Sequence, residues 1–190
     1  MLLVPFFTLG QPENSKFKIG DQAPNFEGLD QNQSTFNLEN GLSAGPVLVV
    51  FYRGEWCGYC NRYLSELMER KDEFDELNIQ IVGMSPEIEE NRSKTIEQSG
   101  IDFPVLVDKD HLISDAFGLT FDLDEKTKKR YDGYGIDLTQ ANGNDRYALP
   151  VPATYLIDRD GIIRFIHYDP NYSKRADIDE IVRVASEGIE

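Results

Sequence analysis

The chain has 190 residues, which is enough for one well-packed core and short for two, so a single domain is expected. Its formal net charge is −15 and its sequence pI is about 4.5. Nucleic acids and anionic membrane surfaces carry the same sign of charge, which argues against both as partners.

The first ten residues, MLLVPFFTLG, are apolar. No Lys or Arg precedes this run, and Pro5 interrupts a stretch that is too short to span a membrane. We therefore expect residues 1–15 to form a flexible arm, residues 16–190 to form the domain, and the protein to be cytoplasmic.

The next elements alternate between the strand and helix patterns. Residues 19–40 place turn residues between short runs and predict a β-hairpin. The run PVLVVFY (46–52) is continuously apolar, which is typical of a central strand covered on both faces. From Gly58 to Leu77 the apolar residues recur at helical spacing, which predicts one helix of roughly five turns.

The alternation continues and indicates an α/β fold whose core is a βαβ unit with parallel strands. The expected elements are a strand at 78–85, a helix at 87–99, a strand at 103–108, a short helix at 111–117, a hairpin at 152–167 with an Asp-Arg-Asp-Gly turn, and a last helix at 174–187.

Residues 118–150 break this rhythm. The segment mixes charges with glycine and asparagine turn residues, and its pattern allows at best one helix, around 124–132. A long irregular segment inside a compact domain is usually a lid, an interface or a mobile insertion. We expect an insertion that precedes the last hairpin.

The stretch FYRGEWCGYC (51–60) contains both cysteines of the chain and its one tryptophan. Cys57 lies at a strand-to-helix turn, and Cys60 follows one helical turn later. Unsatisfied N–H groups at a helix N-terminus stabilise a thiolate, and a second thiol one turn away can resolve a mixed disulfide or a sulfenic acid. Cys57 and Cys60 are therefore the candidate catalytic residues of a redox site.

Two other interpretations of the pair were weighed. Two small apolar side chains in a core are disfavoured because the motif lies in a turn, where exposure is expected. A zinc site would also require His111 and His167, and neither has ligand spacing with the pair or with the other histidine. Redox chemistry is favoured, and it needs no metal, flavin or nicotinamide cofactor in this chain.

The order of five motifs resembles the alkyl hydroperoxide reductase C and thiol-specific antioxidant (AhpC/TSA) family between residues 19 and 187. The motifs are IGDQAPNFEGLD, PVLVVFYRGEWCGYC, MSPE, FPVLVDKD with AFGL, and PATYLIDRDGIIRF. The combination of FYRG-x-WC-x-YC with RFIHYDPNYSKR is similar to the peroxiredoxin-like subgroup. The resemblance implies a thioredoxin-like fold, in which a central mixed sheet is flanked by helices. It also implies a cis-proline loop that faces the thiols, with Pro152 in that place and Val151 before it.

The resemblance leaves open which cysteine attacks. Typical peroxiredoxins carry a proline and a threonine before the attacking cysteine, and counting back from Cys60 puts Arg53 and Cys57 at those two positions. In thioredoxin-type enzymes Cys57 would attack and Cys60 would resolve. Typical peroxiredoxins also place an arginine before the last hairpin, where this chain has Pro152, so the positions of the family's threonine and arginine are both changed.

Four residues near the pair are candidates for substrate binding: Arg53, Trp56, Val151 and Pro152. Trp56 precedes Cys57 and could report its oxidation state. Arg53 could hold a thiolate or guide a hydroperoxide oxygen, or it could simply pair with Glu55.

The resemblance thus places peroxide reduction first, with regeneration of the pair by an external dithiol such as thioredoxin. Thiol-disulfide exchange on protein or small-molecule disulfides is the second hypothesis. A redox-regulated interaction module, in which residues 118–150 bind a partner, is the third. The sequence does not fix the oligomeric state, and a homodimer is among the assemblies that it allows.

Overall fold

The fold is known from a computed structural model that describes residues 14–188. Residues 1–13, on which most of the expected arm falls, lie outside the described residues. The strands are β1 (Glu27–Leu29), β2 (Thr35–Asn37), β3 (Val47–Phe51), β4 (Gln80–Ser85), β5 (Val105–Val107), β6 (Thr120–Asp122), β7 (Ala148–Pro150), β8 (Ala153–Ile157) and β9 (Ile163–Tyr168). The α-helices are α1 (Leu38–Ala44), α2 (Gly58–Glu69), α3 (Lys71–Glu76), α4 (Glu89–Ser99), α5 (Leu112–Phe117), α6 (Glu125–Gly133), α7 (Leu138–Asn142) and α8 (Ile178–Ser186), and a 3-10 turn, η1 (Lys109–His111), precedes α5.

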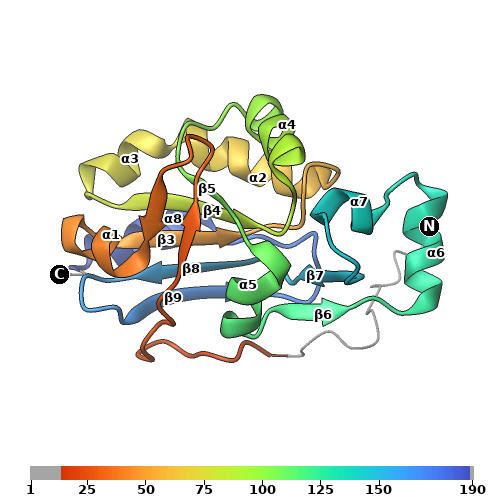
Figure 1. The fold of residues 1–190 in the computed structure, drawn as a ribbon. Coiled ribbons are helices and arrows are strands. Elements are labelled where there is room, and N and C mark those ends of the chain that lie inside the picture. Colours follow the sequence, from red (N-terminus) through yellow and green to blue (C-terminus); the bar gives the residue numbers. More distant parts are fainter. Residues whose placement is uncertain (1–13, 189–190) are drawn as a thin grey trace, which may run out of the picture.

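A five-stranded mixed sheet forms the centre of the fold, in the order β5-β4-β3-β8-β9 (Figure 1). β3 pairs in parallel with β4 and antiparallel with β8. All five residues of β3 are buried, and its side chains alternate between two hydrophobic cores. The continuous apolar run therefore occupies a central strand covered on both faces, as predicted.

Helices cover both faces of this sheet. One core is built from α2, α3 and α8 and includes Leu64, Phe74 and Ile181. The opposite core includes Leu42 of α1 and Phe117 of α5. The predicted central mixed sheet flanked by helices is confirmed, as is the N-terminal hairpin, which is β1 and β2.

The expected five-turn helix is in fact two helices, because the chain leaves helical geometry at Arg70 (φ −109°, ψ 14°). Leu67 before the break and Phe74 after it are both fully buried. The apolar spacing thus continues in phase through the break, which is why the sequence pattern did not reveal it.

Residues 118–150, called the 118–150 segment below, contain more regular structure than the single expected helix. β6 and β7 pair antiparallel, and α6 and α7 lie between them in the chain. A small third core holds the segment together and extends to Trp56; it comprises Phe121, Leu123, Leu138, Leu149 and Val151. The segment lies at the end of the sheet where β3 runs into α2 (Figure 1).

The predicted cis-proline at Pro152 is wrong, because no peptide bond among the described residues is cis. The trans form is favoured by about 0.5–1 kcal/mol for an ordinary bond before proline. Here the chain passes from β7 into β8 with only two residues between them, and the Val151 N–H donates to the Leu119 carbonyl at 2.9 Å. The trans bond fits this extended path.

Across residues 14–188, none of the helices has both the length and the apolar character that crossing a membrane requires.

Candidate active site

The two cysteines are joined by a disulfide, with their Cα atoms 5.2 Å apart. Cys57 is the N-cap residue of α2, and Cys60 lies in the first turn of that helix. The connection from β3 depends on Gly54, whose φ of +146° is strained for any other residue. A Cβ at this position would also lie 2.8 Å from Nε1 of Trp56. A glycine therefore lets the turn bring Trp56 and Cys57 to the end of the sheet.

The two cysteines differ in whether they line a cavity. Both cysteines are almost completely buried, with 2% of Cys57 and 1% of Cys60 exposed. Cys57 lines a cavity of about 310 Å³, and Cys60 is not among the residues that line it. A small molecule that enters this cavity therefore meets Cys57.

Arg53 joins the disulfide to the 118–150 segment. Its Nη2 donates to Sγ of Cys57 at 3.4 Å, and its Nη1 donates to the Tyr131 hydroxyl at 3.0 Å. The guanidinium also lies 4.0 Å from the ring centroid of Tyr172 and 4.9 Å from that of Trp56. Burial lowers the pKa of Arg53. The guanidinium thus lies beside the sulfur of Cys57, and within residues 14–188 it forms no salt bridge with Glu55.

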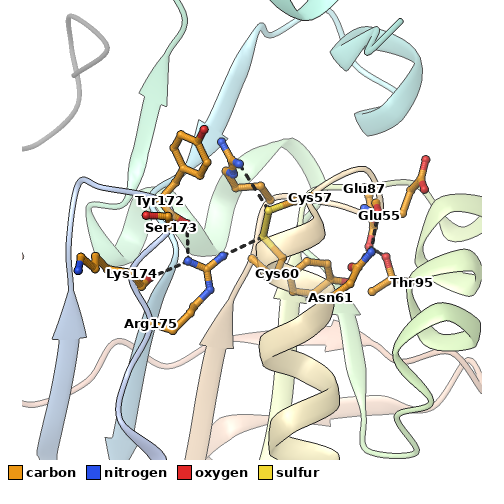
Figure 2. Close-up of a disulfide and its surroundings, with 12 residues drawn as sticks. Glu55, Cys57, Cys60, Asn61, Glu87, Thr95, Tyr172, Ser173, Lys174 and Arg175 are labelled. Carbon is orange, nitrogen blue, oxygen red and sulfur yellow. Dashed lines mark hydrogen bonds between the residues drawn. A yellow bond between two sulfur atoms is a disulfide. The ribbon is translucent and has the colours of Figure 1, made fainter. Parts of the chain in front are cut away.

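A second arginine, which the sequence did not single out, approaches the other sulfur. Nη2 of Arg175 donates to Sγ of Cys60 at 3.2 Å, and its Nη1 donates to the carbonyls of Tyr172 and Lys174 (Figure 2). Burial, together with the positive charge of Arg53, lowers the pKa of Arg175 to about 10. Arg175 is the last residue of the RFIHYDPNYSKR motif, but nothing in that motif indicates a contact across 115 residues of chain.

Within residues 14–188, neither arginine forms a salt bridge with a carboxylate. Arg53 is buried and Arg175 is half-buried, and each donates a hydrogen bond to a sulfur of the disulfide. A buried cation is unfavourable without a counter-ion. Thiolates formed on reduction would supply that counter-charge, so the surroundings of the pair favour its anionic form.

The buried carboxylate of Glu87 supports this turn, and the sequence analysis did not identify it. Oε2 of Glu87 accepts from the Glu55 N–H at 2.8 Å, while Oε1 accepts from the Tyr52 hydroxyl at 2.5 Å and the Thr95 hydroxyl at 2.9 Å. Glu87 is 1% exposed, and burial raises its pKa. The only signal for it was its place in the MSPE motif. Glu87 fixes the backbone of the turn that carries Trp56 and Cys57 (Figure 2).

The structure brings together only part of the predicted substrate-binding set. Arg53 and Trp56 line the cavity with Cys57. Val151 is fully buried in the third core, Pro152 is buried between β7 and β8, and neither lines this cavity. No group of three or more His, Cys, Asp or Glu residues in the described part of the chain is arranged to hold a metal ion.

The chain is similar to a known protein family and to individual proteins of known type. Residues 19–166 match the model of the AhpC/TSA family. The chain is 28% identical over 163 residues to peroxiredoxin Bcp from Escherichia coli strain K12, an alignment that covers 85% of this chain and 92% of that protein. It is 25% identical over 159 residues to the thiol-disulfide oxidoreductase ResA from Bacillus thuringiensis, which covers 82% of this chain and 74% of ResA.

The fold is similar to that of solved peroxiredoxin structures. The crystal structure of peroxidoxin BcpB from Mycobacterium tuberculosis superposes with a TM-score of 0.71 at 22% identity, over 90% of this chain and 97% of that one. The thioredoxin-like fold implied by the sequence motifs is thus confirmed.

The contact between Arg175 and Cys60 can be tested in the reduced protein, in a Cys57→Ser background that leaves one thiol. Replacing Arg175 by Met removes the cation and should disfavour the thiolate. We expect the midpoint of the ultraviolet thiolate absorbance to move to higher pH. Arg183→Met, on the exposed side of α8, is the control and should leave the midpoint in place. An unchanged midpoint in Arg175→Met would mean that the arginine does not stabilise this thiolate.

The buried carboxyl of Glu87 predicts a pH dependence of stability. Because its pKa is raised, the folded protein binds this proton more tightly than the unfolded chain does. The contribution of Glu87 to the free energy of unfolding is therefore fully present below the ordinary pKa of 4.5 and is lost as the pH rises through the raised value.

Urea unfolding of the oxidised wild type and of Glu87→Gln at several pH values measures this contribution. The advantage of the wild type over the variant should fall as the pH rises above 4.5. Glu90→Gln, at a carboxyl in the first turn of α4 whose side chain is 74% exposed, should show no such trend. An advantage that grows with pH would contradict a raised pKa at Glu87.

Proposed function

The chain belongs to the AhpC/TSA family, and we propose that it is a peroxiredoxin-like thiol peroxidase. In this proposal the Cys57–Cys60 pair reduces a hydroperoxide, and an external dithiol such as thioredoxin restores both thiols. The supporting observation is that Cys57 lines a cavity and Cys60 does not, while each sulfur receives a hydrogen bond from its own arginine, the buried Arg53 or the half-buried Arg175. The names of the Bcp relatives point to the same chemistry.

We assign the attack to Cys57 on grounds of access. Its thiolate attacks one oxygen of the O–O bond, the bond breaks, and the other oxygen leaves as an alkoxide that takes up a proton to give the alcohol, or water in the case of hydrogen peroxide. Cys57 becomes a sulfenic acid. Its position at the N-terminus of α2 and the Arg53 contact both favour the thiolate that begins the reaction.

Cys60 then resolves the sulfenic acid. Its sulfur attacks the sulfur of Cys57, water leaves, and the internal disulfide forms. Arg175 would stabilise the Cys60 thiolate that makes this attack. The two electrons taken by the peroxide are returned when an external dithiol reduces the disulfide and is itself oxidised.

This order differs from the one obtained by counting back from Cys60 in typical peroxiredoxins. That count makes Cys60 the attacking residue, but Cys60 does not line the cavity. The count also places Pro152 where those enzymes have an arginine. Here Arg53 and Arg175 approach the sulfurs from other positions in the chain, so a cation is available at each thiol even though that position is changed.

The second candidate is thiol-disulfide exchange, in which Cys57 attacks a substrate disulfide instead of a peroxide. It is favoured by the CxxC spacing, with Cys57 as the N-cap of α2. It is also favoured by the similarity to ResA over most of the chain. The two candidates share the attacking residue and differ in the bond that it breaks.

We also propose that the protein acts in the cytoplasm. Both cysteines of the chain belong to the redox pair, which leaves no structural disulfide that would require an oxidising compartment.

The assignment can be tested with the two serine variants, reduced and treated with hydrogen peroxide in the presence of dimedone, a reagent that traps sulfenic acids. Cys60→Ser should accumulate the trapped sulfenic acid at Cys57 because nothing resolves it. Cys57→Ser should give none on the same timescale. Mass spectrometry of the labelled peptide reads out the result.

Each other outcome has a definite meaning. Trapping in Cys57→Ser but not in Cys60→Ser would reverse the roles of the two cysteines and leave a peroxidase. Trapping in neither variant would contradict peroxide reduction itself.

A further inference from the structure

The cavity beside Cys57 is far larger than hydrogen peroxide requires. Its volume is about 310 Å³, whereas one water molecule occupies about 30 Å³ of liquid and hydrogen peroxide is only modestly larger. Cavities of about 300 Å³ and above are typical of sites for small organic molecules. The reacting sulfur thus lies in a space that would hold an organic group next to the peroxide bond.

Half of the residues that line this cavity are aromatic, and they come from three parts of the chain; Arg130 and Ile136 also line it. Trp56 comes from the turn and Tyr59 from α2, while Tyr172 follows β9. Tyr131 and Tyr134 come from the 118–150 segment. Edge-to-face contacts hold two pairs of these rings in place, Trp56 with Tyr131 at 5.3 Å and Tyr59 with Tyr172 at 5.9 Å between ring centroids.

Two of these rings are exposed to solvent at the edge of the cavity. Tyr134 is 74% exposed and Tyr59 is 48% exposed. The large hydrophobic side chains that stand exposed in the described part of the chain are Ile19, Leu29, Tyr59, Leu112 and Tyr134. Exposed apolar groups gathered around a cavity are typical of a ligand-binding surface. Two of the five, Tyr59 and Tyr134, line the cavity that leads to Cys57.

Arg53 supplies the polar end of the same site. It is 5% exposed, its Nη2 contacts the sulfur of Cys57, and its Nε is buried without a hydrogen-bond partner in the described residues. An oxygen that approaches the sulfur of Cys57 therefore comes close to a cationic donor. The cavity combines a donor at the reacting end with aromatic rings along the sides.

We propose that this cavity selects hydroperoxides with an aromatic body, and that Tyr134 and Tyr59 are the residues that determine this specificity. The proposal rests on the proposed function and names its substrate class. The hydroperoxide group would lie beside the sulfur of Cys57 within reach of the Arg53 guanidinium, and the aromatic body would pack among the tyrosines. When the O–O bond breaks, one oxygen passes to the sulfur of Cys57, the other takes a proton, and an aromatic alcohol is left in the cavity.

The kinetic test compares kcat/KM for cumene hydroperoxide, tert-butyl hydroperoxide and hydrogen peroxide, with dithiothreitol as the reductant. In the wild type we expect the values to fall in that order. Tyr134→Ala removes one exposed ring and should lower the ratio of the cumene hydroperoxide value to the hydrogen peroxide value by about three- to tenfold. Tyr134→Phe keeps the ring and should keep most of the ratio.

A matched control uses Leu112→Ala on α5, a large apolar side chain with 68% exposure that does not line this cavity. It should leave all three values unchanged. A wild-type ratio at or below one, or the same ratio in Tyr134→Ala as in the wild type, would overturn the proposal. Because Tyr134 is mostly exposed, its replacement should not prevent folding.

A binding measurement keeps the test independent of turnover. The probe is 2-phenylpropan-2-ol, the alcohol formed from cumene hydroperoxide, added to the oxidised protein while the fluorescence of Trp56 is followed. We expect a saturable change that is weaker in Tyr134→Ala and absent with tert-butanol at the same concentrations. No saturable change, or an equal one in Tyr134→Ala, would overturn the aromatic site.

The two experiments together separate this proposal from the proposed function. Binding of the alcohol without reaction with any hydroperoxide would contradict peroxide reduction and leave the aromatic site standing. Peroxide reduction without binding of the alcohol would contradict the aromatic site and leave the proposed function standing.

Discussion

The guanidinium of Arg53 makes the contact on which the rest of the site depends. It donates to the sulfur of Cys57 and to the hydroxyl of Tyr131, and it lies against the rings of Trp56 and Tyr172. One buried group thus links the redox pair, the turn that carries it, the 118–150 segment and the loop after β9. These contacts enclose the cavity through which Cys57 is reached.

The free-energy cost of placing two arginines beside the cysteine pair depends on the oxidation state of that pair. Beside a neutral disulfide, the buried Arg53 and the half-buried Arg175 are cations without a salt bridge to a carboxylate in the described residues, and burial lowers the pKa of both. Beside thiolates each would gain an opposite charge at hydrogen-bonding distance. The surroundings therefore favour the dithiol form over the disulfide, which suits a pair that must be returned to its reduced state by an external dithiol.

Local patterns in the sequence predicted the parts of the fold and site that depend on neighbouring residues. The apolar run of β3 and the change of period after Gly58 located the strand, the turn and the helix that carry Cys57 and Cys60. Trp56 and Arg53 were found because they adjoin the pair in the chain. The break at Arg70 was missed because the buried residues on either side of it keep the helical phase.

The remainder of the site depends on contacts between distant parts of the chain, which no local pattern records. Arg175 reaches Cys60 across 115 residues, and Glu87 supports the turn from the start of the chain that leads into α4. Tyr131 and Tyr134 lie in a segment whose mixed charges gave no sign that its rings would line the cavity beside Cys57. The cis-proline was inferred from the family alone, and the path of this chain from β7 to β8 takes the trans bond.

The most direct measurement is stopped-flow fluorescence of the reduced wild-type protein, because Trp56 is the only tryptophan and adjoins Cys57. The reduced protein is mixed in separate experiments with hydrogen peroxide, cumene hydroperoxide and a small disulfide at equal concentrations. If the protein is a peroxidase, we expect a fluorescence change whose rate rises linearly with hydroperoxide concentration and exceeds the rate with the disulfide. A slow change with both hydroperoxides and a fast one with the disulfide would contradict the account and identify a thiol-disulfide oxidoreductase.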